Sequence, residues 1–356
     1  MKLKTLALIT LVNLFVFTSC TDDNDTTAVA PKGDYQNGLL ISNEGNFGTG
    51  VGTVTYVSGD LDTVENKVYQ NVNGTTLGNA LQSIAFNGDL AYLIENGSNT
   101  IEIVNRYTFI SEGSIDTGFS NPRYMAFSNG KGYVTNWGDG NVATDDYIAV
   151  VDLLTNSVTS TISVAEGPEQ IVSKNNKLYV ALEGAFNSNN KVLIIDALNT
   201  ASVTEIEVND NPEQLQFDAN GDLIVLSKGD NRFWLPNAIE TKGAITKINT
   251  SSYAIESVLE FADGSHPNFL VLDNNIIFYY LDGSVYKMNA TETTLPTTAI
   301  VSDVSFYGMT VKNGNILGVD AKDFSSNGDL LIYNATSGAL LETLEMEIIP
   351  SKVYFN

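Results

Sequence analysis

The chain has 356 residues, of which 43% are hydrophobic, and its formal net charge is −24. A surface this acidic repels phosphate backbones and anionic lipid, so we expect no nucleic-acid partner and no membrane contact other than a covalent anchor. The single cysteine, Cys20, excludes structural disulfides and cysteine-rich metal clusters, and the single histidine, His266, excludes histidine-rich copper or zinc centres.

The N-terminus has the pattern of a signal peptide. Two lysines precede the apolar run Thr5–Phe17, which is too short to span a bilayer as a permanent helix. The next residues, F-T-S-C ending at Cys20, resemble the lipobox of bacterial lipoproteins, with phenylalanine where leucine is commoner. This resemblance implies that residues 1–19 are a lipoprotein signal peptide and that Cys20 is lipidated. The alternative is an ordinary secretory signal with an incidental cysteine.

Acidic residues follow the cysteine directly. The stretch T-D-D-N-D at Thr21–Asp25 looks like the surface-export signal of Bacteroidota-type lipoproteins, and the alternative is a plain solvated spacer. Residues 20–37 contain few large apolar side chains, so we expect a lipidated, flexible tether there. We therefore expect an outer-membrane lipoprotein, exposed on the cell surface or facing the periplasm.

One strand pattern recurs through residues 38–356. It reads Pro, two residues, apolar, any residue, apolar, and two copies lack the proline. The copies begin 41, 46, 44, 55, 39 and 44 residues apart, at Leu81, Pro122, Pro168, Pro212, Pro267, Phe306 and Pro350. A repeat of about 40–50 residues that contains only strands is typical of a propeller blade. The sequence therefore predicts an all-β fold, a seven-bladed β-propeller of four-stranded antiparallel blades.

The two ends of this domain are expected to share one blade. Leu39–Ile41 reads as the second strand of a blade, and no first strand precedes it. Pro350–Asn356 reads as a first strand with nothing after it. Pairing the two would hide two sheet edges, so we predict that the C-terminal strand completes the N-terminal blade.

The long loops between the second and third strands of the blades form the expected binding face. These loops lie at one end of the ring and differ from one another, and binding residues concentrate on such loops. The candidate ligand-binding residues are Asn43, Glu44, Asn46, Phe47, Glu95, Asn136, Trp137, Glu183, Phe186, Asn231, Arg232, Phe233 and Trp234. Aromatic plates and amide groups suit a large, mainly neutral ligand. The starts of the inner strands also face the central opening and carry Arg123, Glu169, Glu213, His266 and Asn268.

Structural alternatives exist for several of these residues. Phe233 and Trp234 could fold under their own loop, Glu44 and Glu95 could cap backbone amides, and His266 is expected to make a local hydrogen bond. The sequence contains no G-x-S-x-G or H-E-x-x-H motif, and no spacing singles out a set of carboxylates. We therefore predict no catalytic residue, cofactor or metal ligand. A calcium ion in the central channel, as in sugar-lactone hydrolases, is the alternative.

Several segments resemble the YncE-like (YVTN-type) surface propellers of Bacteroidota lipoproteins. They are S-N-E-G-N-F-G from Ser42, N-T-I-E-I-V from Asn99, N-P-R-Y-M-A-F-S-N-G-K-G-Y-V from Asn121 and G-P-E-Q-I-V from Gly167. The resemblance covers roughly Gly38–Asn356 and implies a seven-bladed propeller. One member type, BtuG, captures cobalamin at the cell surface and passes it to a TonB-dependent outer-membrane transporter.

The leading hypothesis is a non-enzymatic, surface-anchored binding lipoprotein. It would capture a nutrient for a TonB-dependent transporter, and a corrinoid such as cobalamin is the ligand that the resemblance implies. One alternative is a protein-interaction scaffold or adhesin without a small ligand, and a second is a calcium-dependent hydrolase of the lactonase type. The loops do not match a cobalamin site residue by residue, so the motifs support the fold more strongly than the ligand.

Overall fold

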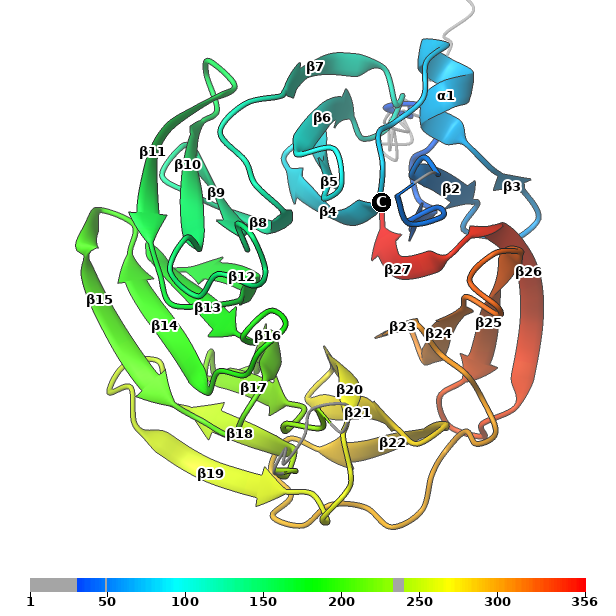
Figure 1. Cartoon of the computed structure of the whole chain (residues 1–356). Helices are drawn as coiled ribbons and strands as arrows, with labels where there is room; N and C mark the ends of the chain where they lie inside the picture. Colours follow the sequence, from blue (N-terminus) through cyan, green and yellow to red (C-terminus); the bar gives the residue numbers. More distant parts are fainter. Residues whose placement is uncertain (1–30, 49, 233–239) are drawn as a thin grey trace, which may run out of the picture. The chain divides into compact units, whose positions relative to one another are not determined.

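The computed structural model describes residues 31–48, 50–232 and 240–356. Within these residues, 27 strands form seven antiparallel sheets, which surround a central axis as blades (Figure 1). The predicted all-β, seven-bladed propeller is confirmed. The described part of the chain contains one short helix, α1 (Val68–Asn73), and no helix there is long and apolar enough to cross a membrane.

Each blade runs from an inner strand beside the axis to an outer strand at the rim. The inner strands are β4 (Leu81–Asn87), β8 (Pro122–Ser128), β12 (Pro168–Lys174), β16 (Pro212–Phe217), β20 (Asn268–Asp273), β23 (Gly308–Lys312) and β27 (Pro350–Phe355). The second strands are β1 (Leu39–Asn43), β5 (Leu90–Glu95), β9 (Lys131–Asn136), β13 (Lys177–Leu182), β17 (Leu223–Ser227), β21 (Ile276–Leu281) and β24 (Asn315–Asp320). The third strands are β2 (Thr53–Val57), β6 (Thr100–Asn105), β10 (Tyr147–Asp152), β14 (Lys191–Asp196), β18 (Ala244–Ile248), β22 (Ser284–Asn289) and β25 (Asn327–Asn334). The outer strands are β3 (Val64–Glu65), β7 (Ser111–Ile115), β11 (Ser157–Ser163), β15 (Asn199–Glu207), β19 (Ile255–Glu260) and β26 (Leu340–Ile348).

One blade departs from the predicted four strands. The sheet of β20, β21 and β22 has three, and residues 290–305 follow it without forming an outer strand. This segment touches β22 through an isolated bridge between Val301 and Val285. Pro296 lies in the middle of the segment, and a proline cannot donate the backbone hydrogen bond that a strand ladder needs.

The ring closes as predicted. β27 pairs antiparallel with β1, so that Leu39 lies opposite Phe355 and Ile41 lies opposite Val353. The Asn356 side chain adds hydrogen bonds of 2.6 and 2.7 Å to two backbone carbonyls near this blade. The first blade therefore combines both ends of the propeller, and neither β1 nor β27 presents a free edge at their junction.

The structure differs from the predicted tether boundary at Gly38. Tyr35 is buried, and its ring packs edge-on against Tyr56 and Phe109 at centroid distances of 5.2 and 5.5 Å. The packed part of the chain therefore begins before Gly38, because this aromatic ring enters the core between the first two blades. The predicted signal peptide and Cys20 lie outside the described residues.

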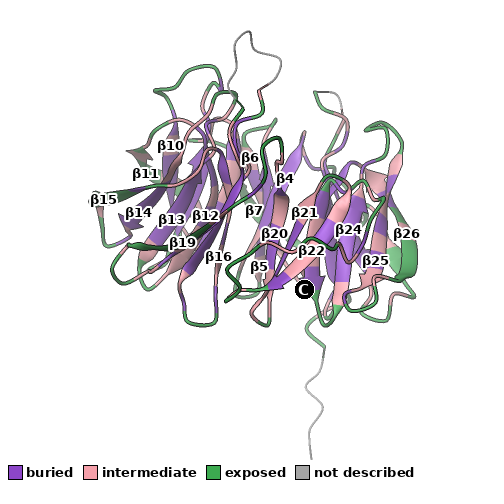
Figure 2. Cartoon of the chain, turned by 90° about the horizontal axis from the view of Figure 1, so that it is seen from below, coloured by how far each residue is buried: buried purple, intermediate pink, exposed green. Residues whose placement is uncertain are grey.

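Face-to-face packing of the blades forms the core. Seven clusters of buried apolar residues occur in the described part, and each joins two neighbouring blades. The second strands carry almost continuous apolar runs because both of their faces are covered. The outer strands are mostly exposed (Figure 2). Burial is thus greatest in the second strands and lowest at the rim, while the inner strands beside the channel are partly buried.

Candidate functional site

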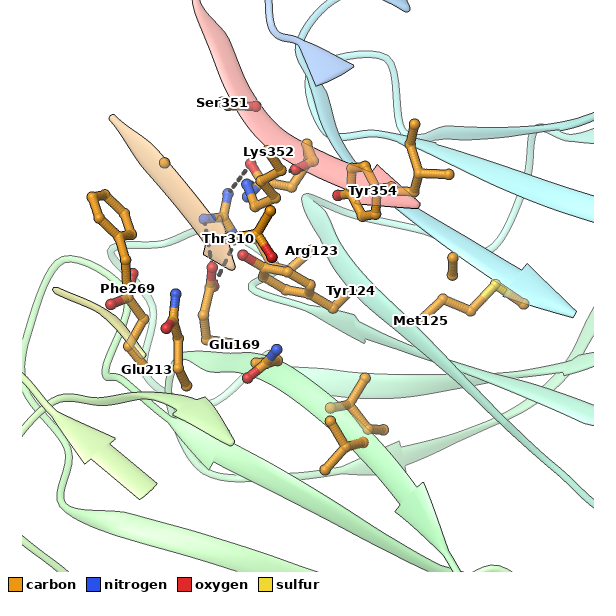
Figure 3. Close-up of a pocket in the computed structure, with 18 of the residues that line it drawn as sticks. Arg123, Tyr124, Met125, Glu169, Glu213, Phe269, Thr310, Ser351, Lys352 and Tyr354 are labelled. Atoms are coloured by element: carbon orange, nitrogen blue, oxygen red, sulfur yellow. Dashed lines mark hydrogen bonds and ion pairs between the residues drawn. The ribbon is translucent and has the colours of Figure 1, made fainter. Parts of the chain in front are cut away.

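A channel of about 1250 Å³ follows the axis and is lined by residues of all seven inner strands. The second residue of every copy of the recurring pattern lines it: Gln82, Arg123, Glu169, Glu213, Asn268, Tyr307 and Ser351. The third residue also lines it in six copies: Tyr124, Gln170, Gln214, Phe269, Gly308 and Lys352. The same pattern that builds the ring therefore places polar side chains around the loop-side half of the channel, where Figure 3 shows several of them.

A local irregularity explains why two successive residues face the axis. The residue before the pattern is left-handed in five copies, with φ values of 55°, 57°, 73°, 55° and 57° at Ala80, Asn121, Gly167, Asn211 and Ile349. The ladder to the second strand then shifts register at the start of most inner strands, for example between Pro122 and Met125. Such bulges bend the strand and break its alternation, so both residues can turn towards the channel.

Arg123 and Glu169 form the central ion pair of the channel (Figure 3). The guanidinium donates to both carboxylate oxygens, at 2.8 and 3.0 Å, and to the Gln82 side chain at 2.9 Å. The Cζ atom of Arg123 lies 3.8 Å from the ring centroid of Trp137, so the guanidinium also makes a cation–π contact. Burial opposes the charge of Arg123, but Glu169 outweighs burial and raises the pKa of Arg123. The two hydrogen bonds between them hold the guanidinium and the carboxyl group in fixed positions.

Lys228 forms a second charged group in the channel wall. Its ammonium contacts Glu183 and lies 3.7 Å from Glu213. Burial acts against the charge of Lys228, but the two carboxylates outweigh it and raise the pKa of Lys228. Burial raises the pKa of Glu213 to about 6, against the pull of Lys228. The Glu213 Oε2 atom has no hydrogen-bond partner among the described residues.

Aromatic side chains lie at the loop-side mouth: Phe47 lines the channel, while Phe186 and Phe324 do not line it and pack against residues that do. Phe47 and Phe186 are 85% and 60% exposed, and Phe186 packs edge-on against Trp137 at 6.1 Å. On another blade the exposed Phe324 packs edge-on against Tyr307, whose hydroxyl donates to Glu44 at 3.3 Å. Large exposed rings above a polar channel form a surface that can cover the apolar part of a ligand.

The other half of the channel is richer in apolar residues. Its wall includes Ile84, Met125, Ile171, Leu270 and Val353 of the inner strands, and the polar residues Ser173, Gln216 and Thr310 also line it. A ligand that enters from the loop side therefore meets aromatic rings first, then fixed charges, and then a mainly apolar wall.

The channel brings together only part of the predicted site. Glu44, Phe47, Trp137 and Glu183 line it, as do Arg123, Glu169, Glu213 and Asn268 of the inner strands. The sequence analysis did not single out Gln82, Tyr124, Lys228, Tyr307 and Lys352, which line it as well. The available signal for most of them was their position as second or third residue of the pattern.

Two predicted ligand-binding residues lie inside the blades. Asn43 and Asn136 are fully buried, and their side-chain amides donate to Thr55 Oγ1 at 3.1 Å and to the Val134 carbonyl at 2.8 Å. This placement corrects the prediction, because both residues end buried second strands and satisfy groups of their own blade. They hold the bases of the loops and do not line the channel.

Glu95 is also outside the channel. It is 2% exposed, burial raises its pKa to about 7, and its Oε1 atom has no hydrogen-bond partner among the described residues. A Cβ at Gly78 would lie 2.5 Å from Glu95 Oε2, so glycine is needed beside this carboxyl group. The prediction that Glu95 contacts a ligand is therefore corrected: it is buried between the first two blades.

The remaining candidates that the structure describes are not among the residues of the channel wall. Asn46 is partly buried and Asn231 is exposed, while Arg232 is held by Asp230 through hydrogen bonds of 2.6 to 3.0 Å. His266 bonds the Lys228 carbonyl and Glu240, each at 2.9 Å, which confirms the expected local hydrogen bonding. Phe233 and Trp234 lie outside the described residues. No group of three side chains suited to hold a metal ion occurs in the described ranges.

The domain family described as "Domain of unknown function (DUF5074)" matches residues 37–347. No curated protein is significantly similar in sequence. Many solved structures share the fold. A quinonprotein alcohol dehydrogenase-like protein from Bacteroides thetaiotaomicron has a TM-score of 0.67 and 16% identity, with 90% of this chain and 78% of that chain covered.

Two further similar structures have names that refer to different enzymes. The periplasmic gluconolactonase of Pseudomonas aeruginosa has a TM-score of 0.61 and 14% identity, with 90% of this chain and 98% of that chain covered. The hydrazine synthase of Kuenenia stuttgartiensis has a TM-score of 0.58 and 13% identity, with 83% and 89% covered. At these identities the likeness establishes the propeller fold and no activity.

Proposed function

The chain belongs to the DUF5074 family, whose function is unknown, and we propose that it is a non-enzymatic binding protein that takes its ligand into the loop-side mouth of the channel. One observation carries this proposal: the exposed rings of Phe47 and Tyr307 line a channel of about 1250 Å³, and two of its cations are paired with carboxylates. Small-molecule sites commonly measure roughly 300–1,000 Å³, so this channel suits a ligand larger than a typical metabolite.

We propose further that the protein is an outer-membrane lipoprotein, anchored through Cys20, that captures a nutrient for a TonB-dependent transporter. The lipobox-like sequence and the resemblance to cobalamin-capturing propellers favour this role, and they favour a corrinoid as the nutrient. The anchor leaves the propeller free to present its loop face to a ligand and to a transporter.

The engagement of the channel carboxylates supports a binding role over hydrolysis. Arg123 engages both oxygens of Glu169, and Lys228 contacts one oxygen of Glu183, so these two carboxylates are already paired with cations of the chain. Turnover of a lactone or ester that needs calcium and stops on addition of chelator would overturn the non-enzymatic proposal.

Calorimetric titration of the mature chain, residues 20–356, with cyanocobalamin tests the corrinoid version. We expect saturable heat and a change in the corrin absorption spectrum. Replacing Phe47 or Phe186 with alanine should weaken binding about fivefold, since one aromatic contact contributes roughly 1 kcal/mol. Leu154→Ala is the matched control, because Leu154 is 95% exposed in a turn at the opposite end of the ring.

Two results would count against this reading. No heat and no spectral change at high micromolar cobalamin would exclude the corrinoid. Equal losses in the Phe186 and Leu154 variants would show that the loop-side mouth is not the binding surface. A protein partner captured without any small ligand would instead favour the scaffold or adhesin alternative.

A further inference from the structure

Lys352 occupies a distinctive place in the channel wall. It lies on β27, where its neighbours Ser351 and Val353 also line the channel but are themselves almost fully buried. Lys352 Nζ donates to the Gln82 carbonyl of the neighbouring blade at 2.8 Å, and the Ile84 amide donates to the Tyr354 hydroxyl at 2.9 Å. Lys352 and Tyr354 therefore point the same way, from the closing strand towards β4 and the channel (Figure 3).

Lys352 differs from the other two cations of the channel in having no carboxylate partner. Arg123 holds Glu169 through two hydrogen bonds, and Lys228 contacts Glu183. Among the described residues, no carboxylate oxygen lies within 4.0 Å of Lys352 Nζ, and its hydrogen bond goes to an uncharged carbonyl. An ammonium has three donors, so Lys352 keeps spare donors in a confined space, with no carboxylate in direct contact.

A second donor lies near it. Lys352 Nζ is 5.5 Å from the ring centroid of Tyr124, whose hydroxyl makes no hydrogen bond to the described residues. Both side chains line the channel, so the hydroxyl and the ammonium can each donate to a ligand there.

We propose that Lys352 and Tyr124 bind an anionic group, so that the ligand of the channel is an anion with an apolar or aromatic body. This inference rests on the proposed binding function of the same channel. The anionic group would sit at Lys352, and the body would lie against the apolar residues of the lower channel or the aromatic rings of the mouth.

The large negative charge of the chain does not oppose this assignment. Salt screens charges on the outer surface over about 8–10 Å, whereas an ammonium in a confined channel acts at short range and through a lower dielectric. Burial lowers the pKa of Lys352, and Arg123 adds to this effect while Glu44, Glu169 and Glu213 oppose it. A bound anion would offset both costs.

A purely structural role for Lys352 makes a different prediction. As a clamp between β27 and β4, it would matter for stability and not for the charge of a ligand. Two probes that share one aromatic body separate these roles: the anion 8-anilinonaphthalene-1-sulfonate and its neutral counterpart N-phenyl-1-naphthylamine.

The experiment measures fluorescence titrations of both probes with the mature chain, residues 20–356. We expect one saturable site for the anion, and Lys352→Gln should weaken it about tenfold to a hundredfold, as expected for a hydrogen bond to a charged group. Binding of the neutral probe should not change. Lys312→Gln is the matched control, since it removes the same charge from the exposed turn-side end of β23.

Removing Glu44 should act in the opposite direction. Glu44 opposes the loss of charge on Lys352, so its negative field also disfavours a bound anion. We expect Glu44→Gln to strengthen binding of the anionic probe about threefold and to leave the neutral probe unchanged.

Wild-type protein gives a test that does not depend on the folding of a variant. Reductive methylation with formaldehyde and a borane, followed by peptide mass spectrometry, should modify Lys352 more slowly when the anionic probe is bound, while Lys312 reacts equally in both samples. Displacement of the probe by 2-naphthoate or by 1-naphthyl phosphate, and not by 2-naphthamide, would distinguish a carboxylate from a phosphate as the natural group.

Failure of this inference is distinguishable from failure of the proposed function. Absence of a saturable site for the anion, equal effects of Lys352→Gln on both probes, or no protection of Lys352 would overturn the anion site. Neutral-probe binding that is lost in Phe186→Ala would still support a ligand channel in that case. Conversely, an anion site that depends on Lys352 would stand even if cobalamin does not bind.

Discussion

Ion pairs occur both on the inner strands and at the rim of the propeller, but they differ in how far their side chains are buried. On the outer strand β15, Glu205 pairs with Lys191 in solvent, and both side chains are about half exposed. On the inner strands, Arg123 and Glu169 form an ion pair that is largely buried in the channel wall. The comparison shows that the position of an ion pair in the blade decides its role. At the rim the two charges stay in solvent, whereas beside the axis they are fixed in the wall of the channel.

Removing the innermost strand of the first blade should have the largest effect. Deleting Pro350–Asn356 exposes the β1 edge and opens the ring, so we expect the single cooperative thermal transition to be lost. Differential scanning calorimetry measures this. Leu340→Ser combined with Leu341→Ser on the outer strand β26 is the control and should melt almost as wild type, because both leucines are half exposed. An unchanged melt of the deletion would refute the closure argument.

Breaking the inner ion pair should have the next largest effect. Arg123→Met leaves the Glu169 carboxylate buried without its partner, and the free energy of unfolding should fall by about 3–5 kcal/mol. Urea unfolding measures the change. Adding Glu169→Leu should recover much of the loss, since it removes the unpaired charge. A loss below about 1 kcal/mol for the single variant would show that the inner and outer pairs are energetically alike.

Glu95 tests the same comparison one strand out from the axis. Its pKa rises from 4.5 to about 7 on folding, so the folded state favours the protonated form. The stability cost of ionisation is absent below about pH 4.5 and grows as the pH rises towards 7. Glu95→Gln should therefore be more stable than wild type at pH 8, by at most about 3 kcal/mol, and the difference should shrink towards pH 5.

Urea unfolding at pH 5 and pH 8 measures this effect. Leu154→Ala in an exposed turn is the control and should differ from wild type equally at both pH values, because it removes no ionisable group. A Glu95→Gln difference that is the same at both pH values would contradict the assignment of a buried, proton-binding carboxyl group.

The outer ion pair should give the smallest effect. Lys191→Met removes the partner of Glu205 at the rim, where solvent screens the charges, so we expect a loss of about 0–1 kcal/mol. Urea unfolding again measures the change in the free energy of unfolding. A loss as large as that of Arg123→Met would remove the distinction between rim and axis.

The fold was predictable because its signal is local and repeated. The spacing of Pro122, Pro168 and Pro212 gave the blade length, and the unmatched strands at Leu39 and Pro350 gave the closure. The site was less predictable. In the sequence, Asn43 and Asn136 looked like loop residues, but each is the last residue of a buried strand. Whether such a residue is exposed depends on where the hydrogen-bonded pairing of the strands ends.

By itself, therefore, the sequence determined the number of blades, the way the ring closes and the end at which the long loops gather, since strand period and loop order are properties of the chain. Only the tertiary structure decided which polar groups meet. Arg123 and Glu169 are 46 positions apart, and Lys352 reaches Gln82 across 270. The physical reason is that the angle between blades and the bulge at each inner strand turn such residues towards one axis, and neither can be read from neighbouring residues.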